Sequence, residues 1–187
     1  MAIRIARIET RTGRQTESDK SLPHVVEKLT SGVVSVVWTD PRIRRYDRPY
    51  RHYRIGIGNK PPVDLSFDEF SGRLAEVQLV LQDESVPVRK IFDEGVLKEF
   101  EYPVVDTSLW GADYYIDFDF DPNIGWQPLG TLNVEIAPSV EFPLQEYDLG
   151  SLRVLIDRDS KIAGLRFIGL DSEQLSIIRQ AEPGVDQ

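Results

Sequence analysis

The chain of 187 residues contains no cysteine, one methionine and two histidines, His24 and His52. Without cysteine there are no disulfide bonds, thiolate zinc sites or cysteine nucleophiles. Neither histidine lies in an H-E-x-x-H or similar spacing, and P-loop, G-x-G-x-x-G and G-x-S-x-G motifs are missing. Since the common signatures of metalloproteases, nucleotide-binding enzymes and serine hydrolases are absent, we expect a protein that is not an enzyme and holds no cofactor.

The sequence also lacks any apolar run near the roughly 20 residues that a membrane-spanning helix needs. The first ten residues, MAIRIARIET, have arginines at positions 4 and 7 and so lack the continuous apolar core of a secretion signal. We therefore expect a cytoplasmic protein that does not bind membranes. The hydrophobic fraction of 41% and charged fraction of 28% are typical of one folded domain, over residues 1–187.

Positive charge is scarce in most of the chain. The formal net charge is −9, but residues 1–60 contain 13 basic and six acidic side chains, whereas residues 61–187 contain nine basic and 25 acidic ones. Such asymmetry favours a charged protein partner, or self-association, or attraction between the two parts of one fold. The overall negative charge disfavours a nucleic-acid partner.

Period-2 alternation of apolar and polar residues dominates the chain and predicts half-buried strands. The clearest are two antiparallel hairpins, 63–68 with 73–82 and 152–157 with 162–169, where Gly164 suggests a bulge. The segment 33–39 is apolar on both faces and is predicted to be central in its sheet. Further strands are expected over 3–8, 53–58, 114–120 and 131–137. The predicted fold is α+β, mainly antiparallel sheet with one or two short helices.

Two segments are predicted to be helical. Residues 21–32 have Ser21 as a cap, an early proline and a terminal glycine. A second helix follows Asp171, which with Gln174 forms a capping-box pattern. Residues 121–130 are rich in proline, glycine and asparagine and are expected to be a loop. Within 83–112, a short helix near 88–100 competes with extended structure.

The two hairpins resemble each other in sequence. VDLSFDEFSGRLAEVQLVLQD (63–83) aligns with LRVLIDRDSKIAGLRFIGLD (152–171) with one gap in the turn, which matches Asp68 with Asp157 and Ala75 with Ala163. Each aspartate can cap backbone N–H groups in its turn. Alternation alone makes any two hairpins look similar, so chance similarity is the alternative to an internal duplication into halves of about 1–100 and 101–187.

The acidic run Asp117-Phe118-Asp119-Phe120-Asp121 would place three carboxylates on one face of a strand. They match the first ligand positions of a calcium loop, but the required glycine is replaced by Pro122 and no glutamate follows at the twelfth position. We therefore expect no metal site. The strip is either a solvated sheet face or a docking surface for a basic partner.

The segment 41–54, PRIRRYDRPYRHYR, mixes six arginines with three tyrosines and is expected to be a loop that ends in a strand from residue 53. Arginine and tyrosine are frequent in the energetically important parts of protein interfaces and also suit phosphate and base stacking. Pairing with the acidic part of the chain is the third interpretation. The partner-binding residues predicted from both features are Asp117, Asp119, Asp121, Asp157, Asp159, Arg48, Arg51 and Tyr50.

The repeated strand, aspartate turn and strand, in LSFDEFSGRLAEVQLVL and VLIDRDSKIAGLRFIGL, resembles the immunity proteins of bacterial polymorphic and contact-dependent toxins. The resemblance implies a cytoplasmic protein that binds and blocks one cognate toxin domain, often a basic nuclease. The arginine-rich segment departs from the pattern of a uniformly acidic inhibitor. The alternatives are an enzyme that acts on a carbohydrate or other small substrate through carboxylates, and a self-associating assembly subunit.

Overall fold

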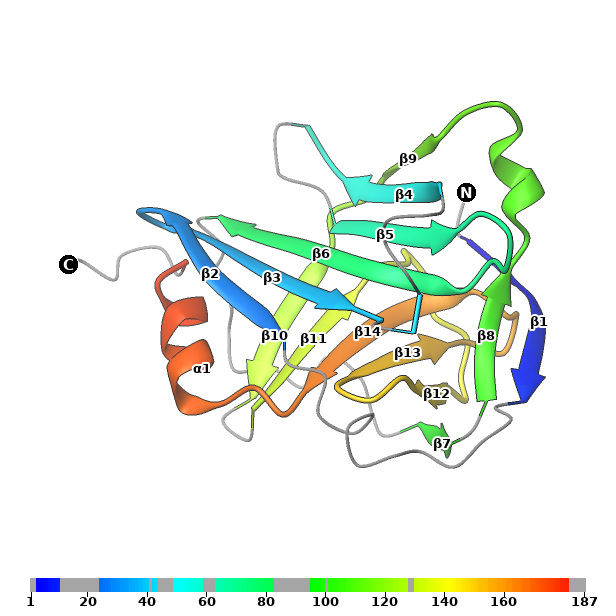
Figure 1. The fold of residues 1–187 in the computed structure, drawn as a ribbon. Helices are drawn as coiled ribbons and strands as arrows, with labels where there is room; N and C mark the ends of the chain where they lie inside the picture. Colours follow the sequence, from blue (N-terminus) through cyan, green and yellow to red (C-terminus); the bar gives the residue numbers. More distant parts are fainter. Residues whose placement is uncertain are drawn as a thin grey trace.

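The computed structural model describes residues 3–10, 24–40, 42–43, 49–58, 63–82, 95–99, 101–127 and 130–181. The described chain is mostly strand, with mainly antiparallel pairs and one short α-helix, which confirms the expected fold class in outline (Figure 1). None of its helices is long and apolar enough to cross a membrane.

Two six-stranded sheets and a ribbon make up the fold. In the first sheet the order β2–β3–β6–β5–β4–β9 corresponds to Val25–Thr30, Val33–Thr39, Leu74–Gln82, Val63–Asp68, Tyr50–Gly56 and Tyr115–Asp119. In the second sheet the order β10–β11–β14–β13–β12–β7 corresponds to Asn123–Gln127, Thr131–Glu135, Ile162–Ile168, Leu152–Ile156, Gln145–Asp148 and Val96–Lys98. The ribbon pairs β1 (Ile5–Thr10) with β8 (Glu101–Val105).

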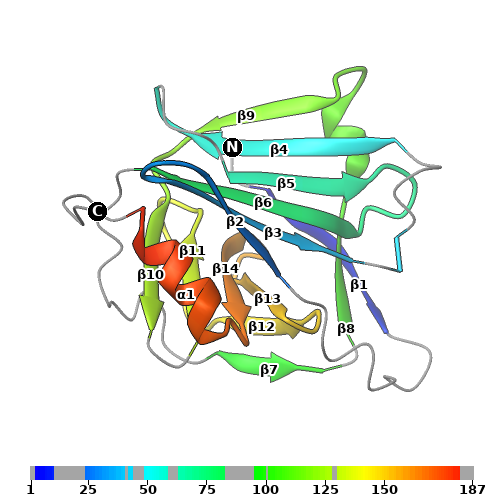
Figure 2. The same cartoon turned by 60° about the vertical axis from the view of Figure 1, so that its left-hand side comes forward.

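The sheets share one hydrophobic core. Trp38 and Phe67 of the first sheet and Leu132 and Phe167 of the second belong to the same cluster of buried side chains. Figures 1 and 2 show the ribbon on one side of the molecule and α1 (Ser172–Arg179) on the opposite side. Asp171 accepts a hydrogen bond from the backbone N–H of Gln174, whose side chain accepts one from the N–H of Asp171 in return, so the predicted capping box is confirmed.

The two sheets have the same topology. In the first sheet the hairpin β2–β3 is followed by the meander β4–β5–β6, whose last strand, β6, pairs with β3. The second sheet repeats this arrangement: the hairpin β10–β11 is followed by the meander β12–β13–β14, whose last strand, β14, pairs with β11. Both predicted hairpins are confirmed as antiparallel pairs. In each sheet the first meander strand also has a parallel neighbour, β9 beside β4 and β7 beside β12.

The correspondence extends to single residues. Each returning hairpin strand has one extra residue, Ala75 in β6 and Ala163 in β14, at a register shift. The carbonyl of each alanine accepts a hydrogen bond from the residue that follows β3 or β11, at 2.8 Å from Asp40 N and 3.0 Å from Ile136 N. The second bulge therefore lies next to Gly164, where the sequence suggested one, and the two bulges occupy the same place in the two sheets.

The turns of the two hairpins are also alike, and the ribbon holds both. Asp68 accepts a hydrogen bond from Ser71 N at 2.7 Å, and Asp157 accepts two, from the N–H groups of residues 159 and 161, both at 2.9 Å. The predicted capping by these aspartates is confirmed. Val105 of β8 donates its N–H to the carbonyl of Gly72, and Ile5 of β1 donates to that of Ser160. Each ribbon strand therefore contacts one hairpin turn in an equivalent way.

Three sequence predictions are wrong. Residues 25–30, expected to be helical, form β2, because they pair with β3 along their length, with one irregularity between Lys28 and Thr30. Leu29, at this irregularity, is exposed. The expected loop 121–130 contains β10, which pairs with β11. The arginine-rich segment becomes β4 at residue 50, three residues earlier than expected, by pairing with β5. Within 83–112 the described residues are extended, apart from the 3-10 turn η2 (Thr107–Trp110); residues 83–94 lie outside the described part.

Candidate functional site

The predicted acidic residues lie on β9, at the edge of the first sheet. Burial alternates along the strand: Ile116 and Phe118 are half-buried and pack on the core, whereas Asp117 and Asp119 are exposed. Asp121, just beyond the strand, is exposed as well. The predicted division into an apolar and an acidic face is therefore confirmed for β9, and it follows from the period of two in a strand.

Arg54 of β4 faces Asp117 across the parallel pair. Its guanidinium donates two hydrogen bonds to the carboxylate, at 2.7 and 2.9 Å, and these bonds raise the pKa of Arg54. The guanidinium carbon also lies 4.6 Å from the centre of the Tyr115 ring, which stacks on His52 at 4.8 Å. This row of arginine, tyrosine and histidine holds the exposed Tyr115 ring in one orientation.

Arg51 connects the start of β9 to the β5–β6 turn. It donates to Glu69 at 2.6 Å and to the carbonyl of Asp113, and its guanidinium carbon lies 4.9 Å from the Tyr114 ring centre. Its side chain is only 11% exposed. Thr107 of η2 donates to the carbonyl of Glu69 at 2.9 Å and joins a third segment to this cluster.

Four large apolar side chains are exposed on the segments that Arg51 and Glu69 join. Phe70 in the β5–β6 turn is 73% exposed, Leu109 in η2 46%, and Tyr114 and Tyr115 at the start of β9 are 55% and 51% exposed. We call these four residues, with Arg51, Arg54 and Asp117, the β9 surface. Singly exposed apolar residues are normal in soluble proteins, but several on adjoining segments are typical of a binding site. Two of these four, Tyr114 and Tyr115, lie against Arg51 and Arg54.

The β9 surface is set in an acidic environment. The described segments that build it, 49–58, 63–70 and 106–121, contain eight carboxylates and two arginines. Both arginines are paired with a carboxylate, Arg51 with Glu69 and Arg54 with Asp117. Arg42 is likewise paired, with Asp40 at 2.7 Å. Pairing with the acidic part of the chain, one of the three interpretations of the arginine-rich segment, thus describes Arg51 and Arg54, whereas Arg42 pairs with Asp40 of the basic part.

The other predicted residues are not brought together with β9. Asp157 is buried, and its carboxylate is engaged by the N–H groups of its own turn. Asp159 is exposed in that turn and pairs with Lys161 at 3.0 Å; the ammonium lowers the pKa of Asp159. Tyr50 is half-buried at the first position of β4, opposite Asp68. Arg48 lies outside the described residues. The predicted site residues did not include Phe70, Leu109, Tyr114 or Tyr115. Phe70 and Leu109 carry no signal without the fold.

A serine, histidine and aspartate meet on the outer face of the same sheet, but they do not form a relay. The same ring nitrogen, His52 Nδ1, lies 3.1 Å from Ser66 Oγ and 3.2 Å from each carboxylate oxygen of Asp64. Activation of a serine requires the hydroxyl and the carboxylate on opposite ring nitrogens. This cluster therefore stabilises the sheet, and it does not activate Ser66 as a nucleophile. Within the described residues no three potential ligands converge as a metal site would require.

The comparisons with known proteins give no family for the chain. No protein-family model matches it, and no curated protein matches it.

Proposed function

We propose that the chain is a non-catalytic protein-binding module that inhibits a basic partner through the β9 surface, in the manner of the immunity proteins of bacterial toxins. The observation that carries the proposal is the group of exposed apolar side chains on the segments that Arg51 and Glu69 join, which are rich in carboxylates. The hairpin resemblance seen in the sequence supports the immunity role, and the chemistry of the surface supports the basic partner.

The affinity of such a surface comes mainly from its aromatic side chains. Tyrosine and arginine are frequent among residues whose truncation weakens binding most, because a ring buries a large area and carries few rotatable bonds. Tyr114 and Tyr115 already lie against arginine guanidinium groups in the free protein. Binding would therefore cost little further side-chain entropy at these positions.

The charge of the surface selects the partner. Within the described segments both arginines are paired with carboxylates, so the charge there comes from the other acids, which include Asp113 and Asp119. A negative surface accelerates encounter with a basic protein and repels acidic ones, and the effect weakens as salt is added.

Co-expression with a panel of basic toxin domains tests the proposal. We expect one domain to be retained on the tagged chain, and cells expressing that domain to survive only when the chain is present. Replacing Tyr114 and Tyr115 by alanine should chiefly raise the dissociation rate, by 10-fold or more, on the order expected for two contact aromatics. Replacing Asp117, Asp119 and Asp121 by asparagine should chiefly slow association and flatten its salt dependence.

Leu29→Ala is the matched control, since Leu29 is 52% exposed on β2, at the opposite edge of the same sheet. It should leave both rate constants unchanged. The proposal is wrong if the tyrosine variant binds and protects as well as the Leu29→Ala variant. Turnover of a small substrate by the pure protein, lost in the aspartate variant, would replace it with the enzyme alternative.

We further propose that the two sheets descend from one duplicated unit. Their shared strand order, equivalent alanine bulges and equivalent contacts with the ribbon support this. Structures of relatives test it. A relative of about half the length that dimerises with exchanged first strands would support duplication, and relatives whose two sheets differ in strand order would contradict it.

A further inference from the structure

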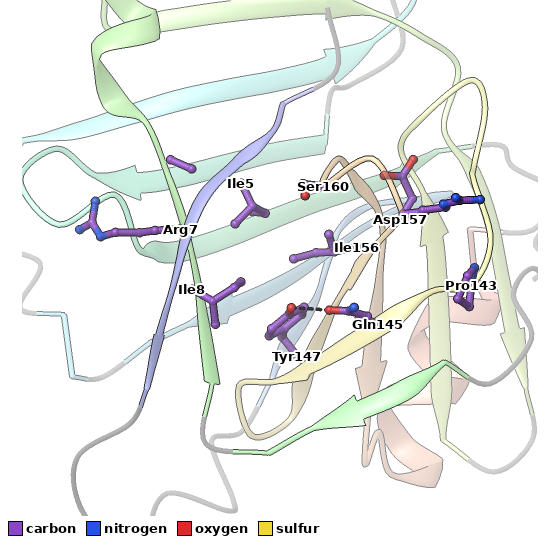
Figure 3. Close-up of a pocket in the computed structure, with 11 residues that line it drawn as sticks. Ile5, Arg7, Ile8, Pro143, Gln145, Tyr147, Ile156, Asp157 and Ser160 are labelled. Atoms are coloured by element: carbon purple, nitrogen blue, oxygen red, sulfur yellow. Dashed lines mark hydrogen bonds between the residues drawn. The ribbon is translucent and has the colours of Figure 1, made fainter.

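A pocket of about 400 Å³ lies between the ribbon and the second sheet (Figure 3). One wall is β1, from which Ile5 and Ile8 face the pocket; the other is formed by Tyr147 and Gln145 of β12 and Ile156 of β13. The turn with Asp157 and Ser160 closes one end. Its lining combines the apolar side chains of Ile5, Ile8 and Ile156 and the Tyr147 ring with polar groups that include Asp157 and Arg158. The Tyr147 hydroxyl donates to Gln145 Oε1 at 2.6 Å.

The shared topology identifies the same place in the first half of the molecule. Because β12 and β13 correspond to β4 and β5, Tyr147 corresponds to Tyr53 and Ile156 to Phe67. The turn residue that accepts a hydrogen bond from the ribbon is Ser160 in one half and Gly72 in the other. Both have positive φ, at 62° and 70°.

In the first half this place is filled by the chain itself. The Trp110 side chain of η2 is 3% exposed, and its ring centre lies 5.9 Å from that of Phe67. Its Nε1–H donates to the carbonyl of His52 on β4 at 2.8 Å. The first site therefore holds an indole that is presented on a single helical turn.

The second half has no equivalent filling segment in the described structure. After Val105 the chain leaves the ribbon at Asp106 and turns into η2, whereas after the corresponding Ile5 it continues as a strand to Thr10. Residues 11–23, which come next, include no aromatic residue. An occupant like Trp110 must therefore come from another part of the chain or from another molecule.

We propose that the pocket binds an aromatic side chain of a protein partner, presented on a short turn as Trp110 is presented on η2. The ring would lie against Ile156 and Tyr147, and the turn would lie against the 157–161 turn, as Thr107 lies against the carbonyl of Glu69. This site is separate from the β9 surface and does not depend on the proposed inhibition of a basic partner.

Titration of the isotopically labelled chain, followed by amide NMR, tests this site with two probes. The first is N-acetyl-tryptophanamide, for which we expect a dissociation constant on the order of 1 mM, as is usual for such small ligands. The second is the acetylated peptide VDTSLWG, which is the sequence of residues 105–111. Both should shift the amides of Ile5, Tyr147, Ile156 and Ser160, and the peptide should bind at least threefold more tightly because it carries the turn.

Ile8→Trp places an indole at the pocket mouth and should abolish these shifts; Ile8 is 41% exposed, so the fold tolerates the change. Ile57→Trp is the control, since Ile57 is 45% exposed and lies outside the pocket. Absent shifts, or shifts that persist in Ile8→Trp, would overturn the site. Equal binding of the peptide and its VDTSLAG analogue would show that no aromatic residue is recognised. None of these outcomes bears on the β9 surface.

Discussion

Removal of the Trp110 side chain should destabilise the protein strongly, although η2 is only one turn at the surface. An indole of this burial removes roughly 200 Å² from water, which at about 25 cal/mol per Å² corresponds to about 5 kcal/mol. Large-to-small substitutions of buried aromatics cost about 3–5 kcal/mol, and the hydrogen bond to the His52 carbonyl adds about 1 kcal/mol. We expect Trp110→Ala to lower the free energy of unfolding by about 4–6 kcal/mol.

Urea unfolding followed by far-ultraviolet circular dichroism measures this loss without relying on tryptophan emission. Trp110→Phe retains a ring beside Phe67 but loses the N–H donor, and should cost only about 1–2 kcal/mol. Leu109→Ala changes the adjacent, 46% exposed residue of the same turn and should cost less than about 1 kcal/mol. Indole added to Trp110→Ala should recover part of the loss, because a dry apolar cavity binds small aromatics.

A loss of stability in Trp110→Ala no larger than that in Leu109→Ala would contradict this expectation. In that case η2 would contribute no packing to the first half, and its use as a guide to the occupant of the second pocket would lose its basis.

Three further predictions concern stability. Burial lowers the pKa of His24. Below about pH 6.5 this histidine therefore takes up a proton in the unfolded chain but stays neutral in the folded protein, so the free energy of unfolding should fall as the pH drops below that value. Urea titrations at several pH values should show a flatter dependence for His24→Gln. Glu146→Ala removes the buried carboxylate that pairs with Arg153 and Arg166, and should lower the free energy of unfolding by about 3–5 kcal/mol. Asp117→Asn breaks an exposed ion pair and should change thermal stability little. Gly72→Ala would place a Cβ 2.2 Å from the Val105 carbonyl oxygen and should lower the melting temperature far more than Gly111→Ala, which has a similar φ in open space.

Short-range patterns explain why some parts of this fold can be predicted. The alternation over 63–82 and 152–169 leaves only one pairing that buries both apolar sets, since a slip by one residue would expose them. The Asp171–Gln174 cap needs only residues three apart. The same holds for the capping aspartates of the two turns, whose partners lie within four residues.

The parts of the structure that were not predicted depend on contacts between different segments of the chain. Residues 25–30 fit a helix about as well as a strand by spacing, and the neighbouring edge of β3 decided between them. The candidate surface could be predicted only in part: Asp117 and Arg51 are visible in the sequence, but Phe70 and Leu109 join them only because the β5–β6 turn and η2 meet around Glu69.

The sequence by itself determined the alternation, the two hairpins, their capping aspartates and the terminal helix, because each depends on residues a few positions apart. Tertiary structure alone decided that β9 pairs with β4, that the ribbon holds both hairpin turns, and that Trp110 fills one of two equivalent sites. These arrangements join residues far apart in the chain, for example Trp110 to His52 with a separation of 58 and Arg54 to Asp117 with a separation of 63. Such contacts are chosen by the burial and hydrogen bonding they complete across the whole fold, and no local pattern encodes them.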